Sequence, residues 1–157
     1  MITGVSALKD MKKHEKLFQL AQDLAKKTYG FLETKGPGIG NHATNQFISQ
    51  LVTLSTKEFG KDYSEKNICG NNSLAVDFYF PEESIIVEIA LGLKNPNTEY
   101  EKDILKALMA KNIGHNVNKL IFISKPGGKK KCKQPGRIAV KEWLLNSNAI
   151  ELEVWDL

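Results

Sequence analysis

The stretch covering residues 73–91 restricts the possible folds of this chain more than any other. It contains two runs rich in β-branched and aromatic residues, and the polar tetrad 81–84 separates them. Apolar runs around a short polar turn are typical of a β-hairpin. If the tetrad forms the turn, the strand register places Asp77 directly across from Glu88.

The two carboxylates of this hairpin share one face of the predicted sheet. Side chains alternate between the faces of a strand, so the apolar residues of both runs point to the opposite face. These apolar residues are Leu74, Val76, Phe78, Phe80, Ile85, Val87, Ile89 and Leu91. Like charges opposed on neighbouring strands are destabilising unless a positive charge lies between them. A divalent cation held by Asp77 and Glu88 is the simplest such charge.

The length and the apolar pattern of the chain limit its class. With 157 residues the chain can build one core, so we expect a single nuclease-like domain over residues 1–157. It has no apolar run of membrane-spanning length and no signal peptide at its start. These features predict a cytoplasmic protein with no membrane partner. Cys69 and Cys132 lack the spacing of a zinc site, and we expect both to be reduced.

Helical and strand patterns alternate along the remainder of the chain. Apolar residues at helical spacing predict helices over 11–33, 41–59, 99–113 and 138–146. Short apolar runs predict further strands over 119–124 and 150–155. Asn41 and Thr98 stand where helix N-caps are expected. Segments 60–72 and 125–137 are expected to be connectors without regular structure.

Segment 125–137 concentrates positive charge. Its cationic residues, interspersed with glycine and proline, are Lys129, Lys130, Lys131, Lys133 and Arg137. Such a cluster is typical of a surface that contacts the phosphate backbone of a nucleic acid. A solvated, mobile surface loop explains the same residues equally simply. The net charge of +4 favours a polyanionic partner, but only mildly.

The order of these elements resembles that of the PD-(D/E)xK nuclease superfamily, which includes restriction endonucleases, Holliday-junction resolvases and repair nucleases. The resemblance covers about residues 40–125 and rests on Asp77, ten intervening residues and the run Glu88-Ile89-Ala90. The strand–strand–helix–strand context supports this short motif. The resemblance implies an α/β fold with a mixed central β-sheet flanked by helices, a restriction endonuclease-like core.

The same resemblance implies a metal site. Asp77 and Glu88 would bind Mg²⁺, or Mn²⁺ as a substitute, with the carbonyl group of Ile89 beside them. The chain departs from the motif at Ala90, which stands where the family has a lysine that orients water and neutralises an oxyanion. Val76 in place of the motif proline is a smaller departure.

Three explanations of Ala90 stay open: a cation supplied from elsewhere, a catalytically silent descendant, or a deliberately inactivated variant. Lys94 and Lys102 are the candidates for a replacement catalytic lysine, with Lys106 further along the same predicted helix. Glu101 and Asp103 could add a carboxylate to the site. For Glu101, a capping box with Thr98 is the simpler interpretation.

The function that follows is a Mg²⁺-dependent DNA endonuclease of the restriction type. Each chain offers one site, so cutting both strands of duplex DNA favours a homodimer. A Holliday-junction resolvase or a repair nuclease is the alternative within the same enzyme class. Outside that class, the alternative is a catalytically silent nuclease-fold module that binds a nucleic acid or a protein.

Overall fold

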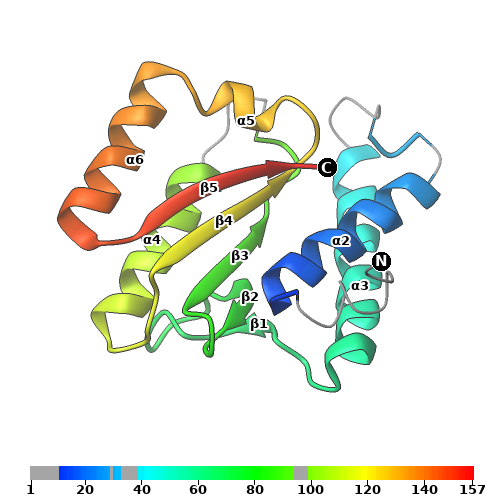
Figure 1. Ribbon diagram of the computed structural model, residues 1–157, viewed down its shortest axis with the longest axis horizontal. Helices are drawn as coiled ribbons and strands as arrows, with labels where there is room; N and C mark the ends of the chain where they lie inside the picture. Colours follow the sequence, from blue (N-terminus) through cyan, green and yellow to red (C-terminus); the bar gives the residue numbers. More distant parts are fainter. Residues whose placement is uncertain (1–10, 29, 33–38, 94–98) are drawn as a thin grey trace, which may run out of the picture. The chain divides into compact units, whose positions relative to one another are not determined.

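A computed structural model of the chain describes residues 11–28, 30–32, 39–93 and 99–157 (Figure 1). The chain divides into two compact units, residues 1–62 and residues 63–157. The expectation of a single nuclease-like domain stays a prediction. Within the described residues, no helix is long and apolar enough to cross a membrane.

The first unit contains two long helices, α2 (Lys13–Lys27) and α3 (Ile39–Phe59), which lie against each other. Helix α2 ends before the predicted residue 33, because the hydroxyl and the N–H of Thr28 both bond the carbonyl of Leu24 and cap the last turn. Helix α3 begins at Ile39, so the prediction that Asn41 caps this helix is wrong. The loop predicted before it lies largely outside the described residues.

The second unit contains a five-stranded mixed sheet. Its strands are β1 (Ser64–Lys66), β2 (Val76–Phe80), β3 (Ile85–Ile89), β4 (Lys119–Ser124) and β5 (Glu151–Asp156). They lie side by side in chain order. The first three strands are antiparallel, whereas β3, β4 and β5 run parallel. The predicted α/β class with a mixed central sheet flanked by helices is therefore confirmed.

The register of the central hairpin is the one that the turn predicts. Phe80 pairs with Ile85, and Phe78 pairs with Val87. The same register, continued by one residue, sets Asp77 opposite Glu88. Phe78, Phe80, Ile85 and Val87 therefore share one face, whereas Tyr79 and Ile86 lie on the other face with the two carboxylates.

Helices α4 (Glu99–Asn112) and α6 (Pro135–Asn148) form the crossovers between the parallel strands and cover the same face of the sheet (Figure 1). A continuous apolar cluster joins these helices to that face. Its largest members are Tyr100, Ile104, Ile86, Leu120, Phe122 and Leu144. Asp77 and Glu88 belong to this covered face, which brings them under α4. Thr98, the predicted cap of α4, lies outside the described residues.

Two predicted connectors contain regular structure. Segment 60–72 includes β1, whose sequence Ser-Glu-Lys has no apolar alternation and becomes a strand only by pairing with β2. Segment 125–137 includes a short helix, α5 (Gly128–Lys131), and the first residues of α6. Pro135 stands at the first position of α6, where its missing N–H costs no hydrogen bond. The prediction of an unstructured loop over 125–137 is therefore wrong.

Helix α5 is attached to the ends of the two neighbouring strands. The carboxylate of Asp156, at the end of β5, accepts hydrogen bonds from the N–H groups of Gly127 and Lys129. Gly128 is buried and lies so close to Ser124 of β4 that a Cβ atom would collide with the serine hydroxyl. The basic residues on α5 therefore stand on a helix that is fixed to the sheet.

This close approach predicts that Gly128→Ala destabilises the second unit. The added methyl group must displace the Ser124 side chain, and overpacking of this kind costs about 1–3 kcal/mol. Gly136→Ala is the matched control, because a Cβ at that helical position meets no atom within 4 Å. Urea unfolding should show a lower midpoint for Gly128→Ala and an unchanged or slightly raised midpoint for Gly136→Ala. Equal midpoints for the two variants would contradict the packing.

Candidate active site

Four ionisable side chains from β2, β3 and α4 meet on the covered face of the sheet. They are Asp77, Glu88, Asp103 and Lys106, which we call the carboxylate–lysine cluster. The ammonium Nζ of Lys106 lies 2.8 Å from Glu88 Oε2 and 3.0 Å from Asp103 Oδ1. It also donates a hydrogen bond of 2.9 Å to the carbonyl of Ala75. One lysine on α4 therefore joins β3, and the residue just before β2, to the helix.

The regular hairpin pairing ends just where this cluster begins. The last pair in register is Phe78 and Val87. Beyond it, the Ile89 N–H donates to Asp77 Oδ2 at 2.7 Å, and the Asp77 N–H donates to Glu88 Oε1 at 3.1 Å. Carboxylate oxygens thus replace backbone carbonyls as acceptors, which satisfies the amides and fixes both side chains.

Helix α4 supplies the other half of the cluster through its periodicity. Asp103 and Lys106 are three residues apart, so both project from one side of the helix. Exposed fractions are 2% for Glu88, 4% for Asp103 and 6% for Lys106. Charged side chains reach such burial only when they are paired. The Cys69 thiol also bonds the Lys106 carbonyl, at 3.4 Å, and both cysteines are free as expected.

Lys106 is a cation whose donors are all in use. An ammonium group has three N–H donors, and here they are directed to Glu88, Asp103 and Ala75. Burial by itself would lower the pKa of Lys106, but the two carboxylates together raise it above its usual range. As placed, Lys106 therefore supplies positive charge and cannot act as a general base.

The three carboxylates have pKa values above their usual range. Burial raises the pKa of Asp77 to about 6, although the Ile89 amide and Lys106 favour the ionised form. Burial, followed by repulsion from Asp77 and Asp103, raises the pKa of Glu88. Burial also raises the pKa of Asp103. One ammonium cannot neutralise three ionised carboxylates, of which Glu88 and Asp103 are buried and Asp77 is half-buried, so a further positive charge would stabilise the ionised cluster.

The structure brings together only some of the predicted catalytic residues. Asp77 and Glu88 meet, and Ile89 joins them through its N–H group. Lys102 and Glu101 are exposed on α4 and have no contact with the cluster among the described residues. Lys94 lies outside the described residues. Lys106, which was not among the predicted catalytic lysines, lies next to Glu88.

The period of α4 contains a sequence signal for Asp103 but not for Lys106. The core-facing residues Tyr100, Ile104 and Ala107 define the buried side of the helix. Asp103 lies next to that side. Lys102 and Lys106 are one turn apart on the same face of α4, so periodicity does not separate them, although Lys106 is buried and Lys102 is exposed. Distance along the chain from Glu88 favoured Lys94 and Lys102. It is a poor guide to which lysine the fold places beside Glu88.

The predicted nucleic-acid residues are divided between two environments. In the part of the chain that the structure describes, Lys129, Lys130, Lys131 and Lys133 form no ion pair, and three of them are exposed. Arg137 differs, because its guanidinium donates to the Leu93 carbonyl at 2.9 Å and lies 4.7 Å from the centre of the Tyr100 ring. Arg137 therefore holds α6 against the start of α4.

The carboxylate–lysine cluster and the basic helix α5 lie towards the same end of the sheet. Strands β3, β4 and β5 are parallel, so their carboxyl ends lie at the same end of the sheet. Glu88 is next to the last residue of β3, and Asp156, which anchors α5, ends β5. In sheets with parallel strands, ligands usually bind at the carboxyl ends of the strands.

The donor set suits a hard divalent cation. Mg²⁺ prefers oxygen ligands and is commonly held by one or two carboxylates, with water and substrate oxygens filling the other positions. Asp77 and Glu88 could supply those two carboxylates. Among the described residues, no three His, Cys, Asp or Glu side chains are arranged to hold a metal between them. A site here would therefore depend on two protein carboxylates and on the substrate.

Comparison of the chain with protein-family models, with curated proteins and with solved structures found no match.

The raised pKa of Asp77 predicts a pH-dependent stability difference between wild type and Asp77→Asn in the presence of EDTA. In the unfolded chain, Asp77 has its ordinary pKa of 3.8, so above pH 6 the folded state must hold a carboxylate that prefers a proton. Asp77→Asn should therefore be more stable by about 1–3 kcal/mol at pH 7. The advantage should shrink as the pH falls through 6 and vanish near pH 4. Denaturant unfolding at each pH measures it.

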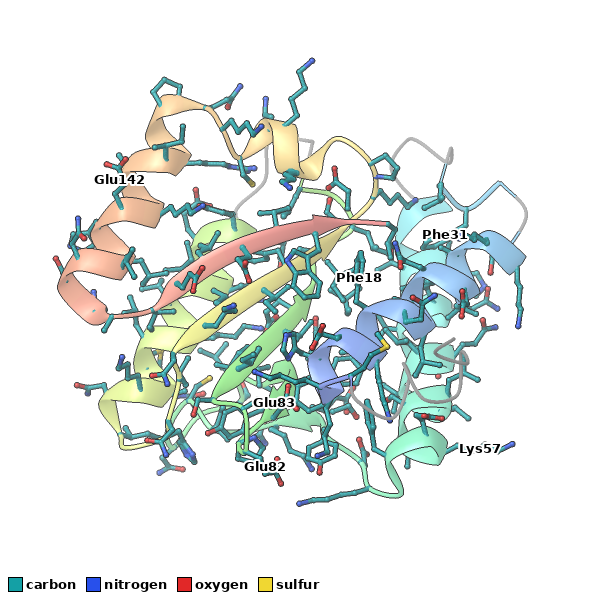
Figure 2. All side chains as sticks on the ribbon, viewed as in Figure 1. Phe18, Phe31, Lys57, Glu82, Glu83 and Glu142 are labelled. Atoms are coloured by element: carbon teal, nitrogen blue, oxygen red, sulfur yellow. The ribbon has the colours of Figure 1, made fainter. Side chains whose placement is uncertain are left out.

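Glu82→Gln is the control for this prediction. Glu82 is exposed in the hairpin turn, where Figure 2 shows it away from α4. Removing its charge should change stability little and equally at all pH values. A pH-independent gain in Asp77→Asn would mean that Asp77 titrates normally.

Proposed function

We propose that this chain is a Mg²⁺-dependent endonuclease that hydrolyses phosphodiester bonds in DNA, with a site of the PD-(D/E)xK kind. One observation carries the proposal: Lys106 places an ammonium 2.8 Å from Glu88, beside the two carboxylates of the motif. In the proposed site, α4 supplies the cation that Ala90 lacks. The position of the lysine in the chain differs from the motif, but its charge adjoins the same carboxylate.

The charge of the cluster supports a metal ion. If all three carboxylates are ionised, Lys106 leaves two negative charges unbalanced, which is the charge that one Mg²⁺ would neutralise. Buried carboxylates with raised pKa values are typical of functional sites. When bound, Mg²⁺ would lower the pKa of a water molecule and stabilise charge on the scissile phosphate.

The residues of the chain have distinct roles in this proposal. Asp77 and Glu88 would hold the ion, and their hydrogen bonds with neighbouring amides keep them oriented before it binds. Lys106 is a positioning residue that fixes Glu88 and adds positive charge near the phosphate. A direct contact with the phosphate would require Lys106 to release Ala75 or Asp103. Asp103 holds the ammonium in place.

The topology of the second unit supports the same assignment. A hairpin that carries the two carboxylates is followed by α4 and by a strand parallel to β3. This is the strand–strand–helix–strand order of the restriction endonuclease-like core. The unpaired lysines of 129–133 offer a surface for the phosphate backbone of DNA. Cutting both strands of a duplex would require two copies of the site, as in a homodimer.

A second candidate is a module of the same fold that binds nucleic acid without cutting it. The saturated donors of Lys106 favour this alternative, because joining α4 to β3 is by itself a sufficient role for a fully engaged cation. Metal-dependent cleavage separates the two candidates.

The nuclease proposal predicts that supercoiled plasmid DNA is nicked in Mg²⁺ or Mn²⁺ and stays intact in EDTA. Glu88→Gln should abolish nicking, since the amide keeps the size of the side chain but loses the ligand charge. Lys106→Met should reduce the rate at least about 100-fold, an effect within the range seen when one electrostatic group is removed. Lys102→Ala, an exposed lysine on the same helix, should cut like wild type.

Circular dichroism must accompany these assays. Removing Lys106 leaves buried carboxylates unpaired and can cost about 3–5 kcal/mol. If Lys106→Met does not fold, Glu88→Gln decides the matter, because Lys106 keeps Asp103 as a partner. Nicking by Glu88→Gln at the wild-type rate, or no nicking by wild type in Mn²⁺, would leave the binding module as the better account.

The basic segment yields a separate prediction about DNA binding. Replacing Lys129 and Lys130 with alanine should weaken binding to all sequences and reduce the slope of log K against log salt by about 0.9 for each lost phosphate contact. Replacing Lys26 and Lys27, also exposed, removes the same charge from α2 and serves as the control. Equal slopes for the two double variants would show an effect of net charge alone.

A further inference from the structure

A cleft of about 490 Å³ lies in the second unit, bordered by α5, α6 and the edge strand β5. This volume is within the range of small-molecule sites. Its lining residues all come from the second unit, and none belongs to the carboxylate–lysine cluster. The proposed nuclease chemistry therefore leaves the cleft unexplained.

The apolar part of the lining comes from β5 and α6. Leu152 and Val154 belong to the apolar cluster on the face of the sheet that α4 and α6 cover. Side chains alternate along a strand, so those of Glu153 and Trp155 point to the opposite face. Ile138 of α6 adds an exposed apolar side chain. The cleft therefore offers apolar surface to the body of a small ligand.

Positive charge enters the cleft from two helices. Lys129 is on α5, Lys133 follows α5 directly, and Lys141 is on α6. Within the described ranges, none of their ammonium groups forms an ion pair. The opposing charge in the lining is the carboxylate of Glu142, an exposed residue of α6 that Figure 2 labels. Three cations beside one carboxylate favour a ligand with negative charge.

The edge of β5 adds a backbone donor to the cleft. The Glu151 N–H donates to the carbonyl of Asn118 at 2.9 Å, on the side of β4. The Leu157 N–H donates to the carbonyl of Ser124 in β4 at 2.8 Å. Successive residues of a strand direct their N–H groups to alternate sides, so the N–H of Val154 points away from β4, where the sheet has no further strand.

This N–H group lacks a partner in the part of the chain that the structure describes. Val154 is only 8% exposed, and no backbone or side-chain oxygen there accepts a hydrogen bond from its N–H. Buried amides in folded proteins nearly always have an acceptor. An oxygen atom of a ligand in the cleft would be such an acceptor. The unpaired amide therefore points to an anion independently of the three lysines.

We propose that this cleft binds a small organic phosphate, with its phosphate group on Lys129, Lys133 and Lys141 and its organic part on the apolar lining. A phosphate monoester carries nearly two negative charges on three acceptor oxygens, so one group can contact several ammonium ions. A carboxylate has one charge and two oxygens, which match three cations less well.

Binding in the cleft has a consequence for the proposed function, and this consequence rests on it. Lys129 and Lys133 also belong to the surface proposed to contact the phosphate backbone of DNA. A small phosphate that occupies their ammonium groups removes them from that surface. The organic phosphate would therefore compete with DNA and act as an inhibitor of the proposed nuclease.

Isothermal titration calorimetry of the full chain in EDTA tests the cleft. The probes are ribose 5-phosphate and adenosine monophosphate, compared with ribose and inorganic phosphate. At least one organic phosphate should bind more tightly than ribose and than inorganic phosphate, because only it uses both the cations and the apolar lining. Lys141→Ala, at an exposed position outside the proposed DNA surface, should weaken this binding at least about 10-fold. Lys102→Ala, an exposed lysine outside the cleft, is the matched control and should bind like wild type.

A variant without a charge change supports the same test. Ile138→Trp enlarges an exposed side chain of the lining, so it should fill part of the cleft and weaken binding as well. Equal affinity in wild type and Lys141→Ala would overturn the proposal. Binding of neither organic phosphate, or binding no tighter than that of inorganic phosphate, would also overturn it.

Competition with DNA is measured by the anisotropy of a labelled duplex in EDTA. Saturating organic phosphate should weaken DNA binding by wild type more than sodium sulfate at the same ionic strength does, and this difference should be lost in Lys141→Ala. Calorimetric binding without competition would keep the cleft and overturn the inhibition. Calorimetric binding without plasmid nicking would remove the nuclease and keep the cleft, whereas nicking without calorimetric binding would do the reverse.

Discussion

The contact of Lys106 with Glu88 and Asp103 is the interaction on which the second unit depends. It joins β3 to α4 across the interior, and the bond to Ala75 extends it to the chain just before β2. A buried ion pair adds little net stability compared with apolar packing, but breaking one costs several kcal/mol, because the remaining charge is left unpaired. The cluster therefore restricts the position of α4, because the helix can pack on the sheet only where its lysine meets Glu88.

The same cluster is a poor arrangement for stability alone. Three carboxylates share one ammonium in a site where Glu88 is almost fully buried, and burial raises the pKa of each acid. Ionised Asp77 adds to that cost, although its carboxylate also accepts a hydrogen bond from the Ile89 N–H. Residues that weaken the fold without a packing role are the ones expected at a site that binds a ligand. The cost of holding three carboxylates beside one ammonium is the physical reason for proposing a cation and a phosphate as partners.

The parallel half of the sheet brings the functional candidates together. Because β3, β4 and β5 are parallel, their carboxyl ends lie together at one end of the sheet, where Glu88, Ser124 and Asp156 are found. Asp156 fixes the basic helix α5 there, and Ser124 leaves room only for a glycine beneath it. The basic helix α5 and the carboxylate–lysine cluster thus lie at the same end of the sheet.

The sequence by itself determined the hairpin and its register from Phe78 to Val87, because strand alternation and a four-residue turn are local properties. It also located β4, β5 and the main helices to within a few residues. Only the tertiary structure decided that β1 is a strand, that α5 is a helix and that Lys106 is the lysine of the cluster. Each of these depends on partners distant in the chain: β2 for β1, Asp156 for α5 and Glu88, 18 residues away, for Lys106. Periodicity indicates which side of a helix or strand is buried. Which charged side chains pair with each other is decided only when the helices and strands pack together.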